Sequence, residues 1–229
     1  MNNYIELKNL SKTFFEKKSV NVLKKINFKF KLGKIYSLMG PSGSGKSTLL
    51  NIISLIDKPS TGSIKFQDNY IDFNNNQKND IFRAGNIGII YQQDNLLSDF
   101  TALENVYLAS LSAGNEKRMA INKAKNILKK VGLSNRLNHY PNELSGGEKQ
   151  RVSISRALIN EPKIILADEP TGSLDKKTSL EIFRLLKKQI NQQRLIIFAT
   201  HNRFLANKSD CLLEMVDGNI KSTNVRDSK

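Results

Sequence analysis

The segment GPSGSGKST, residues 40 to 48, constrains the fold of this chain more than any other stretch. It fits the pattern G-x-x-x-x-G-K-[ST] and lies between the mostly apolar run KIYSLM and the helix-forming run TLLNIISLI. The glycines of such a loop let the backbone bend so that successive N–H groups point at phosphate oxygens, and the following helix adds unpaired N–H donors. A strand, this loop and a helix in that order predict an α/β fold built around a nucleoside triphosphate site.

Each residue of the phosphate loop has an expected task. Lys46 would place a point charge on the β- and γ-phosphates, and the Ser47 hydroxyl would complete the coordination shell of Mg²⁺. The remaining residues of the loop are expected to surround the phosphates: Gly40, Pro41, Ser42, Gly43, Ser44, Gly45 and Thr48.

A helical block interrupts the α/β pattern. The stretches YIELKNL and NVLKKINFKFK alternate as strands do, and SIKF and NYIDF predict two more strands before an Asn-rich loop. Residues 101–160 change to helical character, and from residue 163 strands and helices alternate again. This order predicts an α/β core with an inserted helical subdomain.

Local signals place several helix ends. Thr101 and Glu104 fit a capping box that opens a helix, and a later helix with one apolar face is expected to stop at Gly132. The helix after the phosphate loop is expected to stop near Pro59, and another helix is expected at about residues 176–191.

A second candidate site follows the strand in IILADEP, residues 164–170. The carboxyl ends of parallel strands are where open α/β sheets bind ligands. Asp168 would hold Mg²⁺ through water, and Glu169 would accept a proton from the attacking water or orient it. By itself, a strand that ends in Asp-Glu-Pro is usually an ordinary turn, but the phosphate loop in the same chain favours the catalytic interpretation.

The segment LSGGEKQR, residues 144–151, is a third candidate. Ser145 and Glu148 fit a capping box. Two glycines in the first turn destabilise a helix by about 1 kcal/mol each relative to alanine. Because of this cost we expect them to have a use, which is to leave backbone N–H groups exposed to an anion. The chain then has two helix N-termini that could bind phosphate, but only one loop that carries a lysine. This favours a head-to-tail homodimer in which Ser145–Gly147 of one chain meets the nucleotide of the other.

Composition limits the class of protein. The 25% of charged and 39% of apolar residues indicate a globular chain. The single cysteine, Cys211, excludes an internal disulfide and is expected to be buried. The apolar runs are too short to span a membrane, and the N-terminus lacks an apolar signal core. The net charge of +15 could serve an anionic membrane surface or nucleic acid, but scattered lysines and abundant asparagines favour codon composition as its origin.

In order along the chain, GPSGSGKST, a glutamine after a strand, LSGGE, ILADEP, TGSLD and a histidine after a strand resemble the nucleotide-binding subunit of an ABC transporter. LSGGE separates this family from other phosphate-loop proteins. The resemblance implies one nucleotide-binding domain over residues 1–229: an α/β P-loop NTPase core of the RecA-like kind, with an N-terminal antiparallel β-subdomain and a helical subdomain inserted at about residues 95–160. It also implies that the chain is an ATPase with ATP and Mg²⁺ as its cofactors.

The resemblance also assigns residue roles. Gln92 matches the glutamine that touches Mg²⁺ and the attacking water, and His201 matches the switch histidine that reaches the γ-phosphate. With Glu169 they make up the expected catalytic set. The expected metal ligands are Ser47, Gln92 and Asp168. The signature residues expected to meet nucleotide are Ser145, Gly146, Gly147 and Glu148, and those expected to cross the dimer are Ser173, Leu174 and Asp175.

Two positions depart from the family pattern. Phe14 falls where the family often has a tyrosine that stacks on adenine; it keeps the ring, which favours stacking, and the alternative is a core residue. Asn202 follows His201 where aspartate is usual, which is expected to loosen the switch loop. His139 is expected to be structural.

The stretch LLSDFTALENV, with ADEPTGSLD and LEMVDG, resembles the lipoprotein-releasing group within the family. This resemblance implies a peripheral protein on the cytoplasmic face of the bacterial inner membrane. Through about residues 92–106 it would contact two integral membrane subunits, and it would power the release of lipoproteins from the inner membrane for the outer membrane. No nucleic acid is expected as a partner.

Other functions remain open at this point. Macrolide or peptide exporters and the cell-division complex share much of the pattern. A soluble ABC protein of DNA repair or translation would use the same motifs, although such proteins usually carry paired nucleotide domains or a long coiled coil. A small-molecule kinase would not need LSGGE.

Overall fold

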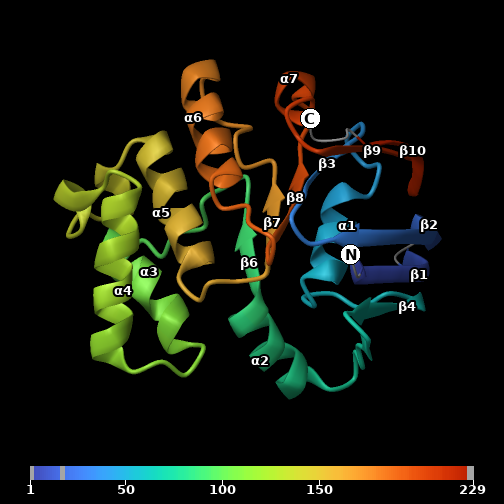
Figure 1. The fold of residues 1–229 in the computed structure, drawn as a ribbon, viewed down its shortest axis with the longest axis horizontal. Coiled ribbons are helices and arrows are strands. Elements are labelled where there is room, and N and C mark those ends of the chain that lie inside the picture. Colours follow the sequence, from blue (N-terminus) through green and yellow to red (C-terminus); the bar gives the residue numbers. More distant parts are fainter. Residues whose placement is uncertain (1–2, 16–18, 226–229) are drawn as a thin grey trace. The chain divides into compact units, whose positions relative to one another are not determined.

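The computed structural model describes residues 3–15 and 19–225 and forms two compact units (Figure 1). The first unit joins the two ends of the chain, Met1–Asp80 and Ile190–Lys229, and the second is the middle, Ile81–Gln189. The division falls inside helix α2 (Asn76–Asn86). None of the helices in the part of the chain that the structure describes is long and apolar enough to cross a membrane.

An antiparallel sheet lies in the first unit. Its strands run in the order β2-β1-β4-β5, with bounds β1 (Asn3–Phe15), β2 (Ser19–Lys31), β4 (Thr61–Phe66) and β5 (Asn69–Tyr70). Alternate apolar side chains of β1, such as Ile5 and Leu7, are buried, which is the pattern that predicted the strand. The strand expected over NYIDF is shorter than predicted, because only Asn69 and Tyr70 pair with β4.

The first unit also holds parallel strands. β3 (Ile35–Met39) pairs in parallel with β8 (Leu195–Ala199) on one side and β9 (Cys211–Val216) on the other, and β10 (Asn219–Val225) pairs antiparallel with β9. All of β8 is buried, as an apolar parallel strand requires. Cys211 is buried as expected, and burial raises the pKa of its thiol. The short helix α7 (Arg203–Ala206) follows β8.

Helix α1 (Lys46–Ile53) follows the phosphate loop and ends earlier than predicted. The sequence suggested a helix up to Pro59, but Ser54 already caps the last turn. Leu55 then takes a left-handed conformation, with φ of 61°, so the helix cannot continue through it. The left-handed conformation at Leu55, rather than the proline, ends this helix.

The second unit combines two parallel strands with helices. β6 (Ile87–Ile90) pairs in parallel with β7 (Ile164–Asp168). The helices are α3 (Ala102–Leu111), α4 (Lys117–Lys130), α5 (Gly146–Leu158) and α6 (Lys176–Lys187), with 3₁₀ turns at Ser134–Arg136 and Pro141–Glu143. Figure 1 shows α3, α4 and α5 side by side. They share an apolar core of Ala102, Val106, Ala124, Leu128, Leu133, Leu144, Val152 and Ile159.

Three predicted helix ends in this unit are confirmed, but α6 stops at Lys187, before the predicted end at about residue 191. Thr101 and Glu104 form a complete capping box, as do Ser145 and Glu148. Gly132 follows α4 with φ of 79°, a conformation that suits glycine and ends the helix. Each box satisfies backbone donors that the first helical turn leaves unpaired.

The loop predicted for the Asn-rich segment is wrong, because α2 begins inside it. Asparagine has a low helix propensity, which is why the segment resembled a loop. The same residue type is also a good N-cap. Here Asn75 Oδ1 accepts from Lys78 N at 3.1 Å, and Asn79 Nδ2 donates to the carbonyl of Asp72 at 2.9 Å. These bonds start the helix despite its composition.

Candidate functional site

The lysine of the phosphate loop is held inside the curve of the loop. Lys46 is only 8% exposed, and its Nζ donates to the carbonyls of Gly40 at 2.8 Å and Pro41 at 3.0 Å. Among the described residues these carbonyls are its only acceptors, so one of the three ammonium donors remains for an anion. The loop thus presents a cation that is already positioned.

Gly45 explains why this loop requires glycine. It is the N-cap of α1 with φ of 101°, which side chains rarely adopt. A Cβ there would lie 2.8 Å from Leu23 Cδ2 and 2.9 Å from both Met215 Cε and the Val22 carbonyl oxygen. The loop is therefore packed against β2 and β9, and the first turn of α1 keeps its N–H donors for a ligand.

Ser44 adds a polar atom that fits a bound anion. Its Oγ is buried and has no hydrogen-bond partner in the described protein. Buried hydroxyls are normally paired. A phosphate oxygen within the loop would satisfy this donor, so the residues present fit a nucleotide.

His201 lies beside the start of the phosphate loop. Leu38 of β3 is in register with Ala199 of β8, so the segments that follow these two strands emerge at the same edge of the sheet. His201 and Gly40 line one cavity of about 350 Å³, together with Met39, Pro41, Arg203, Glu214, Met215 and Val216. A volume of this size suits a small molecule or part of one.

Asn202 has a defined position after His201. Its Oδ1 accepts from Leu205 N at 3.2 Å and caps α7, and its N–H donates to Thr200 Oγ1 at 3.0 Å. Asparagine and aspartate are about equally good N-caps. The amide therefore makes the cap that a carboxylate would make, and the expected loosening of the switch loop stays a prediction.

In the second unit, Asp168 is the last residue of β7 and Glu169 follows it. Asp168 Oδ1 is buried without a hydrogen-bond partner among the described residues. Glu169 has φ of 47°, and its carbonyl accepts from Gly172 N at 2.9 Å. A left-handed glutamate costs about 1–3 kcal/mol, so the surrounding turn must hold it in place. The turn therefore holds its two carboxylates in a specific arrangement rather than a relaxed one.

Gln92 is adjacent to this turn. Ile90 of β6 is in register with Ala167 of β7, so Gln92 and Asp168 lie at the carboxyl ends of neighbouring parallel strands. A Cβ on Gly172 would lie 3.0 Å from Gln92 Nε2, which places the amide directly against the turn after Glu169. An unpaired carboxylate oxygen and an amide oxygen are hard ligands of the kind Mg²⁺ prefers.

The signature segment is held by its own capping box. Ser145 Oγ donates to Glu148 Oε2 at 2.8 Å, and Glu148 N donates back to Ser145 Oγ at 3.3 Å. Arg136 Nε donates to Glu148 Oε1 at 2.8 Å. The bond from Arg136, then those from the N–H and hydroxyl of Ser145, lower the pKa of Glu148 to about 2. His139 has local contacts with Arg136, which supports its structural interpretation.

Gly147 of the signature segment has a packing role that the sequence did not reveal. A Cβ on Gly147 would lie 2.8 Å from Thr178 Cγ2, and one on Gly146 would lie 3.4 Å from Leu174 Cδ2. The start of α5 therefore approaches the segment around Ser173–Asp175 closely. Asp175 caps α6, accepting from Lys177 N at 2.9 Å and Thr178 N at 3.1 Å.

Acid is expected to reveal the contribution of Glu148 to stability. Its pKa is lowered from 4.5 to about 2, so its stabilisation is present above pH 4.5 and is lost as the pH falls toward 2. Glu148→Gln should lower the free energy of unfolding by about 1 kcal/mol at pH 7, and this difference should shrink below pH 4.5. Urea unfolding across this pH range measures it. Glu116→Gln, an exposed change at the start of α4, is the control; equal pH profiles for Glu148→Gln and wild type would contradict the expectation.

Phe14 is not a core residue. The residue is 42% exposed near the end of β1, and Lys12 Nζ lies 4.8 Å from the centroid of its ring. Of the two alternatives left open by the sequence, burial in the core is excluded. An exposed ring remains free to contact a ligand.

Arg156 is a residue that sequence reasoning missed. From α5 its Nη1 donates to the carbonyl of Asn95 at 2.6 Å and its Nη2 to that of Asp94 at 2.7 Å. Gln150 Nε2, on the same helix, donates to the carbonyl of Tyr91 at 3.4 Å. α5 therefore holds the segment around Gln92 at both ends. An arginine inside a helix carries no sequence signal for such contacts.

The chain that carries the phosphate loop, the neighbouring histidine and the strand-end carboxylates is similar in sequence to known proteins. A family model described as "ABC transporter" matches residues 23–172, and the chain belongs to that family. As such it is an ATP-hydrolysing transporter subunit.

Several relatives are similar over nearly the whole chain. The lipoprotein-releasing system ATP-binding protein LolD of Rickettsia bellii is 46% identical over 220 residues, which cover 95% of this chain and 97% of the relative. The protein of the same name from Wigglesworthia glossinidia brevipalpis is 43% identical, with coverage of 98% and 100%. The macrolide export ATP-binding/permease protein MacB of Bartonella quintana is 41% identical over 90% of this chain but only 31% of its own length.

The fold is similar to that of a solved ATP-binding cassette. The dimeric post-hydrolysis structure of the cassette MJ0796, bound to ADP and Pi, has a TM-score of 0.90 and 37% identity, and covers 98% of this chain and 100% of that one. The predicted fold class and the resemblance to this family, including its lipoprotein-releasing group, are confirmed.

Proposed function

We propose that this chain is the ATPase subunit of an ABC transporter complex that releases lipoproteins from the inner membrane for transfer to the outer membrane. The observation that carries the proposal is its 46% identity, over 95% of the chain and 97% of the relative, to a lipoprotein-releasing system ATP-binding protein. Similarity of this extent includes the regions outside the nucleotide motifs, where members of the family differ.

The phosphate loop would bind ATP through the N–H groups of α1 and the ammonium of Lys46. Ser47, Gln92 and Asp168 would hold Mg²⁺, which when bound neutralises charge on the phosphates. The unpaired Asp168 Oδ1 supports this assignment. Glu169 would orient the attacking water and take up its proton, while Gln92 and His201 would contact the water and the γ-phosphate. Phe14 would stack on the adenine ring.

The signature segment Ser145–Glu148 would serve the nucleotide of a second copy of this chain. Ser145 and Gly146 are exposed at the start of α5, and the segment Ser173–Asp175, which lies against it, would cross between the two copies. ATP bound by each chain would join two copies into a homodimer, and hydrolysis would separate them again.

Residues 92–106 would carry this motion to two integral membrane subunits. The chain would then work as one nucleotide-binding domain over residues 1–229, with the helical subdomain at about 95–160, and residues 1–2, 16–18 and 226–229 of this range lie outside the described residues. It would sit peripherally on the cytoplasmic face of the inner membrane.

Loss of the Arg156 contacts is expected to slow turnover. Arg156→Gln removes both bonds to the segment that carries Gln92, so kcat should fall about tenfold while the KM for ATP stays within about twofold. Steady-state ATPase assays separate the two constants. Arg118→Gln, on the exposed face of α4, is the control. An unchanged kcat would show that Gln92 does not depend on this contact.

A macrolide exporter is the second candidate, favoured by the 41% identity to MacB. To separate the two, the Glu169→Gln chain is purified from detergent-solubilised native membranes, and the co-purifying proteins are identified by mass spectrometry. Two membrane subunits with bound lipoprotein would support the proposal. Co-purification of a drug or peptide exporter, or of division proteins, would overturn the proposal that lipoproteins are the substrate. Co-purification of ribosomes or repair factors alone would overturn the transport role.

A further inference from the structure

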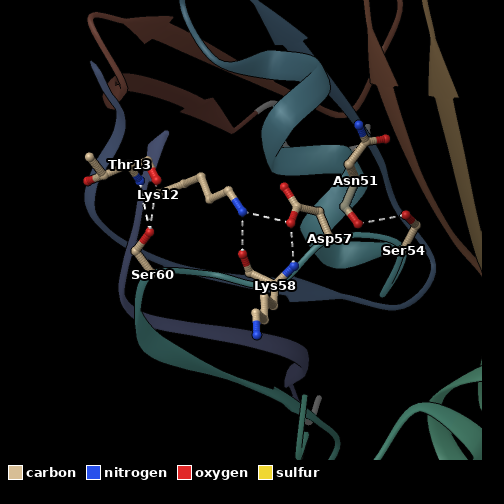
Figure 2. Close-up of polar contacts among 7 residues, drawn as sticks. All are labelled: Lys12, Thr13, Asn51, Ser54, Asp57, Lys58 and Ser60. Carbon is tan, nitrogen blue, oxygen red and sulfur yellow. Dashed lines mark hydrogen bonds and ion pairs between the residues drawn. The ribbon is translucent and has the colours of Figure 1, made fainter. Parts of the chain in front are cut away.

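Lys12, on β1, holds an unusual position for a lysine. The residue is 8% exposed, and its Nζ donates to Asp57 Oδ1 at 2.7 Å and to the carbonyl of Lys58 at 2.8 Å (Figure 2). The same Nζ lies 4.8 Å from the centroid of the Phe14 ring. One ammonium group is thus shared between a carboxylate, a carbonyl and an aromatic face, and these three partners fix where it lies.

The segment that binds Lys12 is itself fixed to α1. The N–H groups of Ile56 and Asp57 both donate to the carbonyl of Asn51, in the last turn of that helix, at 3.1 and 3.2 Å. Asp57 Oδ1 also accepts from Lys58 N at 2.7 Å, as Figure 2 shows. The carboxylate that holds Lys12 therefore cannot move independently of the helix that begins at the phosphate loop.

Ser60 ties the neighbouring residues of β1 to the same segment. Thr13 N donates to Ser60 Oγ at 2.9 Å, and Ser60 Oγ donates to the carbonyl of Thr13 at 3.3 Å (Figure 2). Ser60 N donates to the carbonyl of Ser11 at 2.8 Å. The backbone on both sides of Lys12 is thereby held, and the Lys12 ammonium lies against the Phe14 ring.

We propose that Lys12 is a positioning residue for nucleotide binding, which sets the Phe14 ring at a fixed place relative to α1 and so fixes the distance between the adenine and the phosphates. The inference rests on the proposed function, in which Phe14 stacks on the base. The ammonium lies over one face of the ring, and adenine would stack on the other. A cation on one face also draws ring electrons toward itself, which favours stacking of an electron-rich base on the opposite face.

Equilibrium binding of two probes to the full chain tests the inference: ATP, and ribose triphosphate, which is ATP without its adenine. Lys12→Met should weaken ATP binding on the order of tenfold, the typical scale of one stacking contact, and leave ribose triphosphate within about twofold. Phe14→Ala should do the same, and the double variant should be no worse than either single one, because both remove one contact. Lys12→Arg, which keeps a cation able to stack on the ring, should restore most of the preference for ATP.

Lys65→Met is the matched control, since Lys65 Nζ lies 4.2 Å from the centroid of the Tyr70 ring elsewhere on the same sheet. If Phe14→Ala reduces the preference for ATP but Lys12→Met does not, stacking stands and the inference is overturned. If Lys12→Met weakens both probes equally, Lys12 is merely structural, which also overturns it. If Phe14→Ala changes nothing, the stacking role in the proposed function fails first. Should Lys12→Met not fold, Asp57→Asn gives the same test through the partner, with a partial loss of preference expected and an unchanged preference contradicting it.

Discussion

ATP turnover by the Glu169→Gln variant is expected to fall roughly 10²–10⁴-fold below that of the wild type, while ATP remains bound. An amide of the same shape still donates and accepts hydrogen bonds but takes up no proton. The turn should persist, because its bond from Gly172 N goes to the backbone carbonyl of residue 169. The variant should therefore bind ATP and accumulate as a homodimer. Turnover is measured by phosphate release, and association by size-exclusion chromatography with and without ATP.

Glu161→Gln is the control for this prediction. Glu161 is also a glutamate of the second unit with a left-handed backbone, with φ of 53°, but its carboxylate forms an ion pair with Lys123 at 3.8 Å. Its substitution should leave turnover unchanged. If Glu169→Gln hydrolyses ATP within about threefold of wild type, the assignment of Glu169 to the attacking water is wrong.

Features that depend on neighbours in the sequence were predictable. The phosphate loop, both capping boxes and the stop at Gly132 each follow from a few adjacent residues whose conformational preferences agree. The carboxylates after β7 were also predictable, because a buried apolar strand followed by Asp168 and Glu169 carries its own signal. The left-handed conformation of Glu169, with φ of 47°, was not, since it opposes the preference of the residue.

Features that depend on distant segments were missed. The contacts of Arg156 with Asp94 and Asn95 join residues about 61 positions apart, and those of Lys12 with Asp57 join residues 45 positions apart. The packing of Gly147 against Thr178 is of the same kind. No local preference encodes such pairs, because each residue type is equally at home on a solvated surface. The N-terminus of α2 was missed for a different reason. Asparagine disfavours helix interiors but favours helix starts, so composition alone predicted a loop where the helix begins.

Lys46→Met is expected to weaken ATP binding by roughly 10²–10³-fold, the effect of removing one partner from a desolvated charge pair. Methionine fills a similar volume, so the loop should keep its path through Gly43 and Gly45 while losing the charge aimed at the phosphates. Calorimetric titration of the full chain with MgATP measures the affinity. Thermal unfolding without nucleotide is the accompanying control, and its midpoint should shift little.

Lys46→Arg separates charge from geometry in the same assay. The lysine ammonium fits between two carbonyls at 2.8 and 3.0 Å, and the larger, planar guanidinium cannot take both bonds in that buried space. We therefore expect Lys46→Arg to bind ATP nearly as weakly as Lys46→Met, although its charge is kept. Wild-type affinity in Lys46→Arg would show that charge alone suffices. Wild-type affinity in both variants would instead mean that the N–H groups at the start of α1 carry the phosphate binding without the lysine.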